Sequence, residues 1–310
     1  MGGGRVDPRL EIVNVTPLPR GGRNAVAVTL GLIGDEWTLL ILRYAMTGGA
    51  TRYGDWLERL PISHAVLTNR LARLTGAGLL RRVPEGRRFG YRLSRRGRET
   101  WPILLAIWAW ELAWVPDQAT KLPRMTHAAC GEPFVPVLVC AACRKPTEPR
   151  DVTGRFGPSG TWERSVPAAA TRRRSGATAG PDAGLFPQTM ALIGNRWSAA
   201  LLGAAFLGAR RFTDFAQRLG APPATVADRL CTFVDLGVLE PAEGAYHLTA
   251  KGRAFFPVVM CMIDWGHRWF RAPEGPALVY RHPECADDFR PRLACDRCQH
   301  LLHGSDVIVT

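Results

Sequence analysis

Residues 33–60 read IGDEWTLLILRYAMTGGATRYGDWLERL, and residues 193–220 read IGNRWSAALLGAAFLGARRFTDFAQRLG. The two stretches share the IG pair, the tryptophan that follows it and the spacing of the apolar residues. The matching positions include Trp37 and Trp197, Asp55 and Asp214, Tyr91 and Tyr246, and Trp110 and Trp265. The sequence therefore predicts one unit of about 150 residues that is repeated in tandem, the second copy having diverged.

Within the first unit, the spacing of apolar residues predicts a fixed order of elements. We expect helices over 26–34, 37–46, 53–60, 63–77 and 94–115, and short strands over 79–83 and 89–93. Ser63 follows the break at Pro61 and is a favourable N-cap. Leu67, Leu71 and Leu74 have the spacing of a buried helical face. The order helix, helix, helix-turn-helix, hairpin, helix predicts a winged helix. The whole chain is thus expected to be mainly α with small β-hairpins, an α+β fold.

The composition narrows the class of function. The chain has 310 residues and a net charge of +13, which indicates an acidic partner, with double-stranded DNA as the first candidate. No apolar run reaches the roughly 18 to 20 residues of a membrane span, and the start resembles no signal peptide. We therefore expect a cytoplasmic protein with no membrane partner. No phosphate-binding glycine loop or nucleophile elbow is visible, so no enzyme is predicted.

The pattern His-x2-Cys-x9-Cys-x2-Cys occurs twice, at His127, Cys130, Cys140 and Cys143 and at His282, Cys285, Cys295 and Cys298. Three thiolates and one imidazole suit tetrahedral zinc, and four ligands leave no open position. Each segment is therefore predicted to hold one structural zinc ion, two per chain. His300 or His303 is an alternative ligand in the second site. Cys231 and Cys261 fall outside the pattern and are predicted to be buried core thiols.

The predicted domain boundaries follow from these patterns. They are an N-terminal arm (1–23), a first winged-helix domain (24–116), a first zinc module (117–146), a flexible linker (147–182), a second, divergent winged-helix domain (183–271) and a second zinc module (272–310).

The second helix of a helix-turn-helix enters the major groove, and the wing follows the phosphates or the minor groove. The predicted DNA-binding residues are Ser63, His64, Thr68, Asn69, Arg70 and Arg73 in the helix and Arg81, Arg82, Arg87 and Arg88 in the hairpin. Asn69 can bond adenine with both side-chain groups. Arg70 is assigned to phosphate, because Arg229 matches it in the second unit.

The second unit has lost most of these groups. The matching positions hold Pro222, Pro223, Ala227, Asp228, Arg229 and Thr232. Its hairpin contains Glu240 and Glu243. We interpret this unit as a degenerate reader, and the alternative is that it reads another sequence with Arg210, Arg211 and Arg229.

The runs IGDEWTLLILRYAMTGGATRYGDWLERL, LTNRLARLTGAGLLRR and YRLSRRGRE resemble the HxlR-type winged-helix transcription regulators, relatives of the MarR type. The resemblance covers residues 24–116 and, more weakly, 184–270. The His/Cys tail also resembles an appendage of some members. The resemblance implies sequence-specific DNA binding, usually as a dimer on an inverted repeat. Many members carry a redox-active cysteine about ten residues before the IG pair, where this chain has Asn24 and Gly184.

Two functions and two assemblies remain open at this point. The leading function is a DNA-binding transcription regulator, and the alternative is a zinc-stabilised protein–protein adaptor. The resemblance implies dimerisation through the first and last helices, and their tryptophans persist in both units at Trp37, Trp197, Trp110, Trp265, Trp114 and Trp269. We therefore predict an intramolecular pseudo-dimer, with a homodimer of whole chains as the rival. The sequence leaves open the small-molecule effector, the operator and the direction of regulation.

Overall fold

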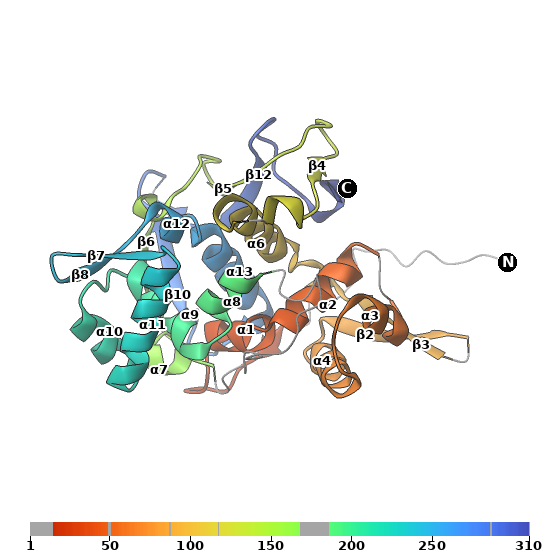
Figure 1. Cartoon of the computed structure of the whole chain (residues 1–310), viewed down its shortest axis with the longest axis horizontal. Coiled ribbons are helices and arrows are strands. Elements are labelled where there is room, and N and C mark those ends of the chain that lie inside the picture. Colours follow the sequence, from red (N-terminus) through yellow and green to blue (C-terminus); the bar gives the residue numbers. More distant parts are fainter. Residues whose placement is uncertain are drawn as a thin grey trace.

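The computed structural model describes residues 15–48, 51–86, 88–116, 118–167, 186–285 and 287–309. Each unit forms a winged helix, and the two winged helices lie at opposite ends of the long axis of the molecule (Figure 1). The last long helices of the two units pack between them. The fold is therefore mixed helix and strand and consists of two related halves, as the repeat predicts.

The first half has the predicted order of elements. They are α1 (Ala25–Ile33), α2 (Glu36–Met46), α3 (Tyr53–Arg59), α4 (His64–Gly76), β2 (Leu80–Glu85), β3 (Arg88–Leu93), α5 (Arg95–Arg98) and α6 (Trp101–Trp114). Ser63 caps α4 by accepting from the Val66 backbone N–H. The single helix predicted over 94–115 is two helices, α5 and α6. Pro102 in the first turn of α6 has no backbone N–H to continue a helix from α5.

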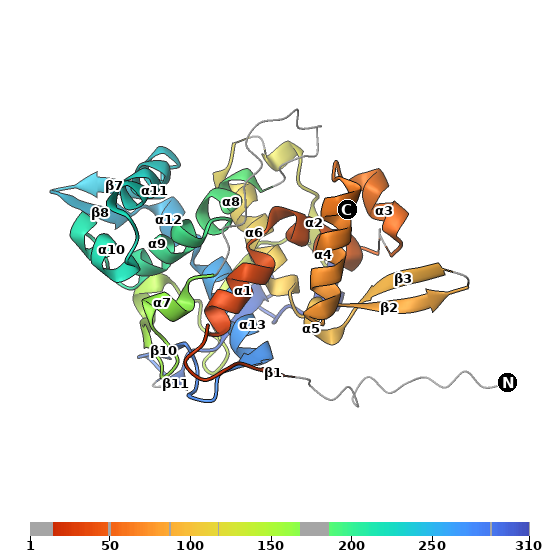
Figure 2. The same cartoon turned by 90° about the horizontal axis from the view of Figure 1, so that it is seen from below.

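The second half repeats this order. Its elements are α8 (Pro187–Ile193), α9 (Arg196–Phe206), α10 (Phe212–Leu219), α11 (Pro223–Asp235), β7 (Leu239–Ala242), β8 (Ala245–Leu248), α12 (Ala250–Arg253) and α13 (Phe256–Trp269). Its wing is shorter, and Glu243 and Gly244 both have positive φ at the tip. Two such residues form the tight hairpin turn that matches the twist of the strands. In Figure 2 the two wings project in opposite directions.

Small strands and turns follow each winged helix. The first half continues with a 3₁₀ helix (Gln118–Thr120), β4 (Met125–His127), β5 (Pro136–Cys140), a 3₁₀ helix (Pro149–Asp151), β6 (Thr153–Phe156) and α7 (Trp162–Ser165). The second half continues with β9 (Phe270–Arg271), β10 (Leu278–His282), β11 (Asp287–Asp288), β12 (Pro291–Cys295), a 3₁₀ helix (Gly304–Asp306) and β13 (Val307–Val309), and β1 (Thr16–Pro17) pairs with β9.

The predicted flexible linker over 147–182 is wrong for residues 147–167. This stretch contains β6 and α7, and β6 pairs with β10 along four residues. Its elements are only three to four residues long, which is too short for a visible hydrophobic period. The rest of the predicted linker, and residues 1–14 of the predicted N-terminal arm, lie outside the described residues.

The appendages of the two halves pair with each other. β4 pairs with β13, β6 with β10, and β5 with β12, all antiparallel. In the β5–β12 pair, Leu138 lies opposite Leu293, its own counterpart 155 residues later in the repeat. A pseudo-two-fold axis therefore passes between these two leucines.

The helices form a second, related seam. α1 of the first half packs on α13 of the second, α8 of the second packs on α6 of the first, and α6 contacts α13. Trp110 Nε1 donates to the Lys251 carbonyl at 3.0 Å, and Trp265 Nε1 donates to the Arg96 carbonyl at 3.1 Å. These two bonds join counterpart residues in opposite directions. Trp110 and Trp265 thus lie at a helix–helix interface, as the sequence predicts.

Two close contacts make this seam specific. Gly266 of α13 faces α1, where an added Cβ would lie 2.3 Å from Thr29 Oγ1. On the other side, the buried Glu111 accepts from the Thr189 backbone N–H at 2.8 Å, in the first turn of α8. Burial raises the pKa of Glu111. The first contact requires glycine at position 266, because there is no room for a side chain. The second orients the N-terminus of α8, whose first backbone N–H groups have no partner within the helix.

Within the described residues, no single helix is long and apolar enough to span a membrane. α1 and α2 pass that test only as a pair, and they are bent by 77° at the break between them. Both helices contribute to the hydrophobic core.

Candidate nucleic-acid interface and metal centres

The eight predicted metal ligands form two groups, each of three cysteines and one histidine. The first group is His127, Cys130, Cys295 and Cys298, and the second is Cys140, Cys143, His282 and Cys285. In each group the ligand atoms all lie within 4.8 Å of one another. Both groups can therefore hold a metal ion, and neither contains His300 or His303.

The pairing within the groups differs from the prediction that each segment closes its own site. Each group takes a His-x2-Cys pair from one half and a Cys-x2-Cys pair from the other. The cause is the antiparallel β5–β12 pairing about the pseudo-two-fold axis. Because β5 ends at Cys140 and β12 ends at Cys295, each strand delivers its Cys-x2-Cys turn to the histidine of the opposite half.

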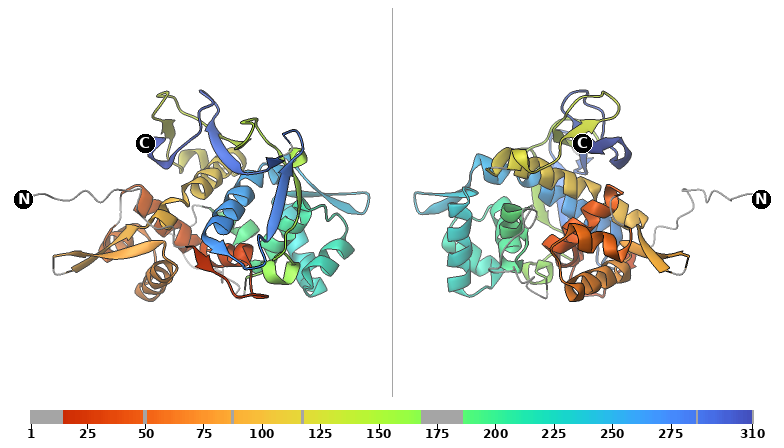
Figure 3. Two further views of the ribbon diagram at one scale, coloured as in Figure 1. Left: turned by 180° about the vertical axis from the view of Figure 1, so that it is seen from behind. Right: turned by 45° about the vertical axis from the view of Figure 1, so that its right-hand side comes forward.

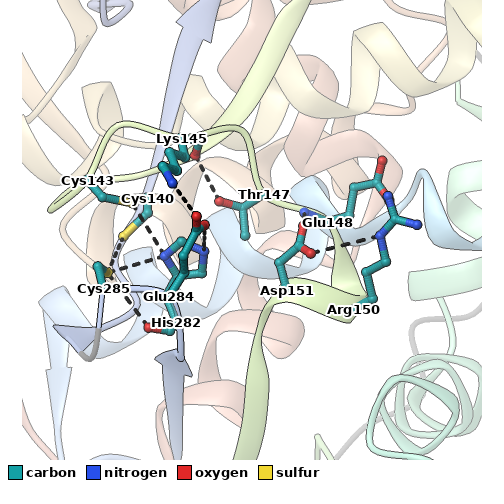
Figure 4. Close-up of polar contacts among 10 residues, drawn as sticks. All are labelled: Cys140, Cys143, Lys145, Thr147, Glu148, Arg150, Asp151, His282, Glu284 and Cys285. Atoms are coloured by element: carbon teal, nitrogen blue, oxygen red, sulfur yellow. Dashed lines mark hydrogen bonds and ion pairs between the residues drawn. The ribbon is translucent and has the colours of Figure 1, made fainter.

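In the second group, His282 Nδ1 faces the metal position (Figure 4). It lies 3.2 Å from Cys285 Sγ and 3.4 Å from Cys143 Sγ, and the Cys140 and Cys285 sulfurs are 3.8 Å apart. The other ring nitrogen, Nε2, lies 3.8 Å from the Glu284 carboxylate, which also pairs with Lys145. A carboxylate that accepts a hydrogen bond from the second nitrogen of a ligating histidine fixes the ring's orientation, and Glu284 lies just beyond that distance here.

In the first group, His127 Nδ1 lies 3.4 Å from Cys130 Sγ and 3.2 Å from Cys298 Sγ, and the Cys130 and Cys295 sulfurs are 4.0 Å apart. The ring of His127 is buried against Phe134. The position that matches Glu284 is Ala129. The two sites therefore share their ligand set but differ in the group behind the histidine.

The two Cys-x2-Cys turns share a backbone shape but differ in what they do to the first thiol. Arg144 and Gln299, the residues after Cys143 and Cys298, have φ of 63° and 60°. In the second turn the Arg297 backbone N–H donates to Cys295 Sγ at 3.4 Å, but burial outweighs such bonds and raises the pKa of Cys295. Burial raises the pKa of Cys140, but bonds from the backbone N–H groups of Cys143 and Ala142 outweigh it and lower the pKa overall. Cys231 and Cys261 are in neither group. Cys261 is buried as predicted, but Cys231 is exposed on α11, which corrects its assignment as a core thiol.

The candidate nucleic-acid surface lies on the opposite side of the molecule, away from the metal groups (Figures 1 and 3). Ser63, His64, Thr68 and Asn69 are exposed on α4, as predicted. Leu67, Leu71 and Leu74 bury the other face of this helix. Of these exposed groups, the Ser63 side chain also caps the helix.

Tyr53, the first residue of α3, is absent from the predicted contact residues. Its hydroxyl lies 3.2 Å from His64 Nδ1 and 3.1 Å from Thr68 Oγ1, and its ring stacks on His64. Tyr53 therefore holds two of the predicted contact residues in place. The signal in the sequence is the matching Phe212, which lacks the hydroxyl in the half that has also lost His64 and Thr68.

Two of the predicted arginines have partners within the fold. Arg70 forms a two-pronged ion pair with Asp35, with both nitrogen–oxygen distances 2.7 Å. Asp35 is buried and caps α2. The structure thus gives Arg70 a role in holding α4 on α2, which is the physical reason against a phosphate contact. Arg73 donates to the Gly31 carbonyl at 2.7 Å, at the end of α1.

The wing carries the remaining predicted arginines. Arg81, Arg82 and Arg88 are exposed on β2 and β3, and Arg87 lies outside the described residues. The Arg82 guanidinium lies over the exposed Phe89 ring, 4.4 Å from its centroid. Two arginines absent from the prediction, Arg52 and Arg92, flank the wing, and both pair with Glu85.

The second half presents a different surface on α11, the helix that matches α4 in the repeat. The exposed positions of α11 include Pro222, Pro223, Ala227, Asp228 and Cys231. Arg229 pairs with its neighbour Asp228, since Asn195 replaces the carboxylate that holds Arg70. Arg210 donates to the carbonyls of Ala205 and Ala209.

The curated relatives that are similar to this chain include three that are described as uncharacterized HTH-type transcriptional regulators. The one from Mycobacterium tuberculosis (strain CDC 1551 / Oshkosh) is 36% identical over 127 residues, which is 39% of this chain and 80% of the relative. Those from Synechocystis and Bacillus subtilis are 30% and 33% identical, over 39% and 27% of this chain and 85% and 82% of their own lengths.

The HxlR-like helix-turn-helix family matches residues 32–119 and again residues 192–274. Together these ranges span more than half of the chain and coincide with the two winged helices. The relatives and the family indicate DNA-binding transcriptional regulation as the function. The chain is a tandem member of the HxlR-like helix-turn-helix family.

Proposed function

We propose that this transcription regulator reads double-stranded DNA mainly through α4 and the β2–β3 wing of its first half, with the second half as a partner that reads little or nothing. The observation that carries the proposal is the contrast between two matching surfaces of one chain. The first has Asn69, His64 and wing arginines, whereas the second has Asp228, prolines and wing glutamates. A carboxylate close to the phosphates opposes binding.

The roles within the first half follow from the exposed groups. Asn69 on the outer face of α4 can bond an adenine edge, and Thr68 can contact a thymine methyl. Tyr53 holds Thr68 and His64 in place before binding, so less side-chain freedom is lost on the DNA. Arg82 and Arg88 on the wing are suited to phosphates or the minor groove.

We further propose that the two metal ions are zinc. Tetrahedral zinc with Zn–S bonds of about 2.3 Å requires sulfurs about 3.8 Å apart. The observed separations of 3.8 and 4.0 Å match this value. A set of three thiolates and an imidazole with no open position is typical of structural zinc. Each ion would join the two halves, since each site takes two ligands from each half.

The two halves are proposed to act together as an intramolecular pseudo-dimer. The swapped helices, the crossed strand pairs and the shared metal groups already supply each half with a partner. A single chain of 34.1 kDa would then be the DNA-binding unit, and its target would have one well-specified half. The rival is a homodimer of whole chains on an inverted repeat.

The test selects binding sites from random double-stranded DNA with the purified chain. Asn69→Ala is expected to relax the preference at one position, at a cost on the order of 1–3 kcal/mol. Arg82→Ala with Arg88→Ala should weaken binding to every sequence and reduce the salt slope by up to about two. Asp228→Ala, at the position that matches Asn69, is the matched control in the second half, and Arg211→Ala removes an arginine there that is not on the wing.

Three outcomes contradict parts of this proposal. A larger effect of the second-half controls would reverse the assignment of the reading half. Failure to select any sequence would favour the adaptor function. A particle of twice 34.1 kDa by light scattering, on a symmetric site, would reject the pseudo-dimer.

A further inference from the structure

A cavity of about 400 Å³ lies in the first half, between the end of α2, one face of α6 and β13 of the second half. Its walls are mostly apolar and include Trp101, Leu104 and Trp108 of α6. Arg43 of α2 is the charged member of the described lining. The volume falls within the about 300–1,000 Å³ of sites that bind small molecules.

The repeat supplies an internal comparison, because the second half has a pocket at the matching place. Residues of its lining match residues that line the first cavity. With the first-half residue given first, the matching pairs are Arg43 and Gly203, Met46 and Phe206, Thr47 and Leu207, Leu104 and Val259, Trp108 and Ile263, and Met125 and Tyr280. By the same measure its volume is only about 80 Å³.

Aromatic rings fill the second pocket at two positions where the first half has methionine, since Phe206 matches Met46 and Tyr280 matches Met125. Phe206 contacts Phe256 at 5.5 Å between ring centroids, and Phe156 contacts Trp162 at 5.0 Å. Tyr280 is partly buried there, and its removal from water raises the pKa of its hydroxyl. No charged side chain belongs to the lining among the described residues, because glycine replaces Arg43. The second pocket is thus a packed core, whereas the first keeps both its space and its cation.

We propose that the cavity of the first half binds a small aromatic carboxylate. The indole rings of Trp101 and Trp108 offer apolar contact area to an aromatic ring. The guanidinium of Arg43 can bond a carboxylate with two parallel N–H donors. An apolar wall with one cation favours an anion that has a large apolar part over either a sugar or an uncharged hydrocarbon.

The cavity is placed where a ligand can affect DNA binding. Arg43 and Thr47 lie on α2, and the other end of α2 holds α4 through the pair between Asp35 and Arg70. Gly304 and Val307 bring the second half to the same cavity. A ligand there contacts both halves and the helix that supports α4. This coupling rests on the proposed DNA-binding role of α4, whereas ligand binding itself does not.

The direct test measures binding of 1-naphthoate to the metal-loaded full chain by calorimetry, with uncharged 1-naphthalenemethanol as the matched probe. One naphthoate per chain is expected, bound more tightly than the alcohol. Arg43→Gln should weaken the naphthoate roughly tenfold or more and leave the alcohol unchanged, because a bond to a charged group is lost. Arg43→Lys should restore part of the affinity.

A second variant fills the cavity with the residues of the other half. Met46→Phe with Met125→Tyr should abolish binding of both probes, and Arg211→Gln in the second half should change neither. The proposal is overturned if neither probe binds at millimolar concentration, or if the filled variant binds as the original chain does. An Arg43→Gln variant with unchanged naphthoate affinity overturns the carboxylate class.

The effect on DNA is measured separately with the selected site. We expect naphthoate to change the DNA affinity, and DNA to change the naphthoate affinity by the same factor. Naphthoate that binds without changing DNA affinity would overturn the coupling alone. Loss of all DNA binding would instead count against the proposed function, with the calorimetric result still standing.

Discussion

The shared metal sites make a prediction that separates two pairings of the same eight ligands. The perturbation is a pair of double variants that each remove two cysteines. In the structure Cys130 and Cys295 belong to one group, whereas Cys140 belongs to the other. Cys130→Ser with Cys295→Ser should therefore destroy one site and leave the other complete. Cys130→Ser with Cys140→Ser should damage both sites.

The measured quantity is the number of zinc ions that each chain retains. The unaltered chain should retain about two zinc ions after dialysis against a mild chelator, the first variant about one and the second close to none. The separation of 4.0 Å between the Cys130 and Cys295 sulfurs supports this assignment, since tetrahedral zinc needs about 3.8 Å. Elemental analysis and native mass spectrometry give the counts. Cys231→Ser, outside both groups, is the control and should keep two.

The opposite result would refute the reasoning. If each segment closed its own site, Cys130→Ser with Cys140→Ser would keep one ion, and Cys130→Ser with Cys295→Ser would lose both. Equal losses in the two variants would mean that the sites bind metal only together. Circular dichroism of each variant shows whether the remaining fold is intact.

Three further predictions concern the seam, the pH dependence and the free thiols. Gly266→Ala should destabilise the chain by about 1–3 kcal/mol in urea unfolding, because its Cβ meets Thr29, whereas Gly203→Ala, with nothing within 4 Å, should not. Burial lowers the pKa of His267 from 6.5 to about 4, so the unfolded chain binds a proton that the folded chain does not. The free energy of unfolding therefore falls as the pH drops below 6.5 toward 4, and this histidine accounts for a loss of about 2 kcal/mol at pH 5. In the His267→Gln variant, the loss of stability between pH 7 and pH 5 should be smaller by that amount. A thiol reagent should modify one cysteine quickly in the metal-loaded chain, and Cys231→Ala should remove that signal, because Cys231 is exposed.

The sequence was sufficient for the architecture of each half. The i, i+4, i+7 leucines of α4, the N-cap Ser63 and the two short strands of the wing are local patterns, and the structure confirms all three. The eight residues that gather into the two groups were also predictable as a set, because two diverged copies keep the same spacing. Local patterns report which residues share a face or a turn, and that is the level at which these predictions succeed.

The pairing of the ligands was not predictable in the same way. A Cys-x2-Cys turn can close with the histidine of its own segment or of the other, and the spacing is identical in both cases. The choice depends on the antiparallel pairing of Leu138 with Leu293, which is a long-range contact. Arg70 shows the same limit, since Asp35 lies 35 residues away and no helical period connects them.

The shared sites also bear on why the two halves diverged unevenly. A change in β5 or β12 affects both metal groups at once, because each group takes ligands from both halves. The seam is likewise reciprocal, with Trp110 bonded to the second half and Trp265 bonded to the first. By contrast, Asn69 and its counterpart Asp228 belong to surfaces at opposite ends of the molecule, and a change in one leaves the other intact. Within this chain, the eight cysteine and histidine residues of the two groups and the bonded tryptophans of the seam therefore match between the halves, whereas the exposed positions of α4 and α11 differ.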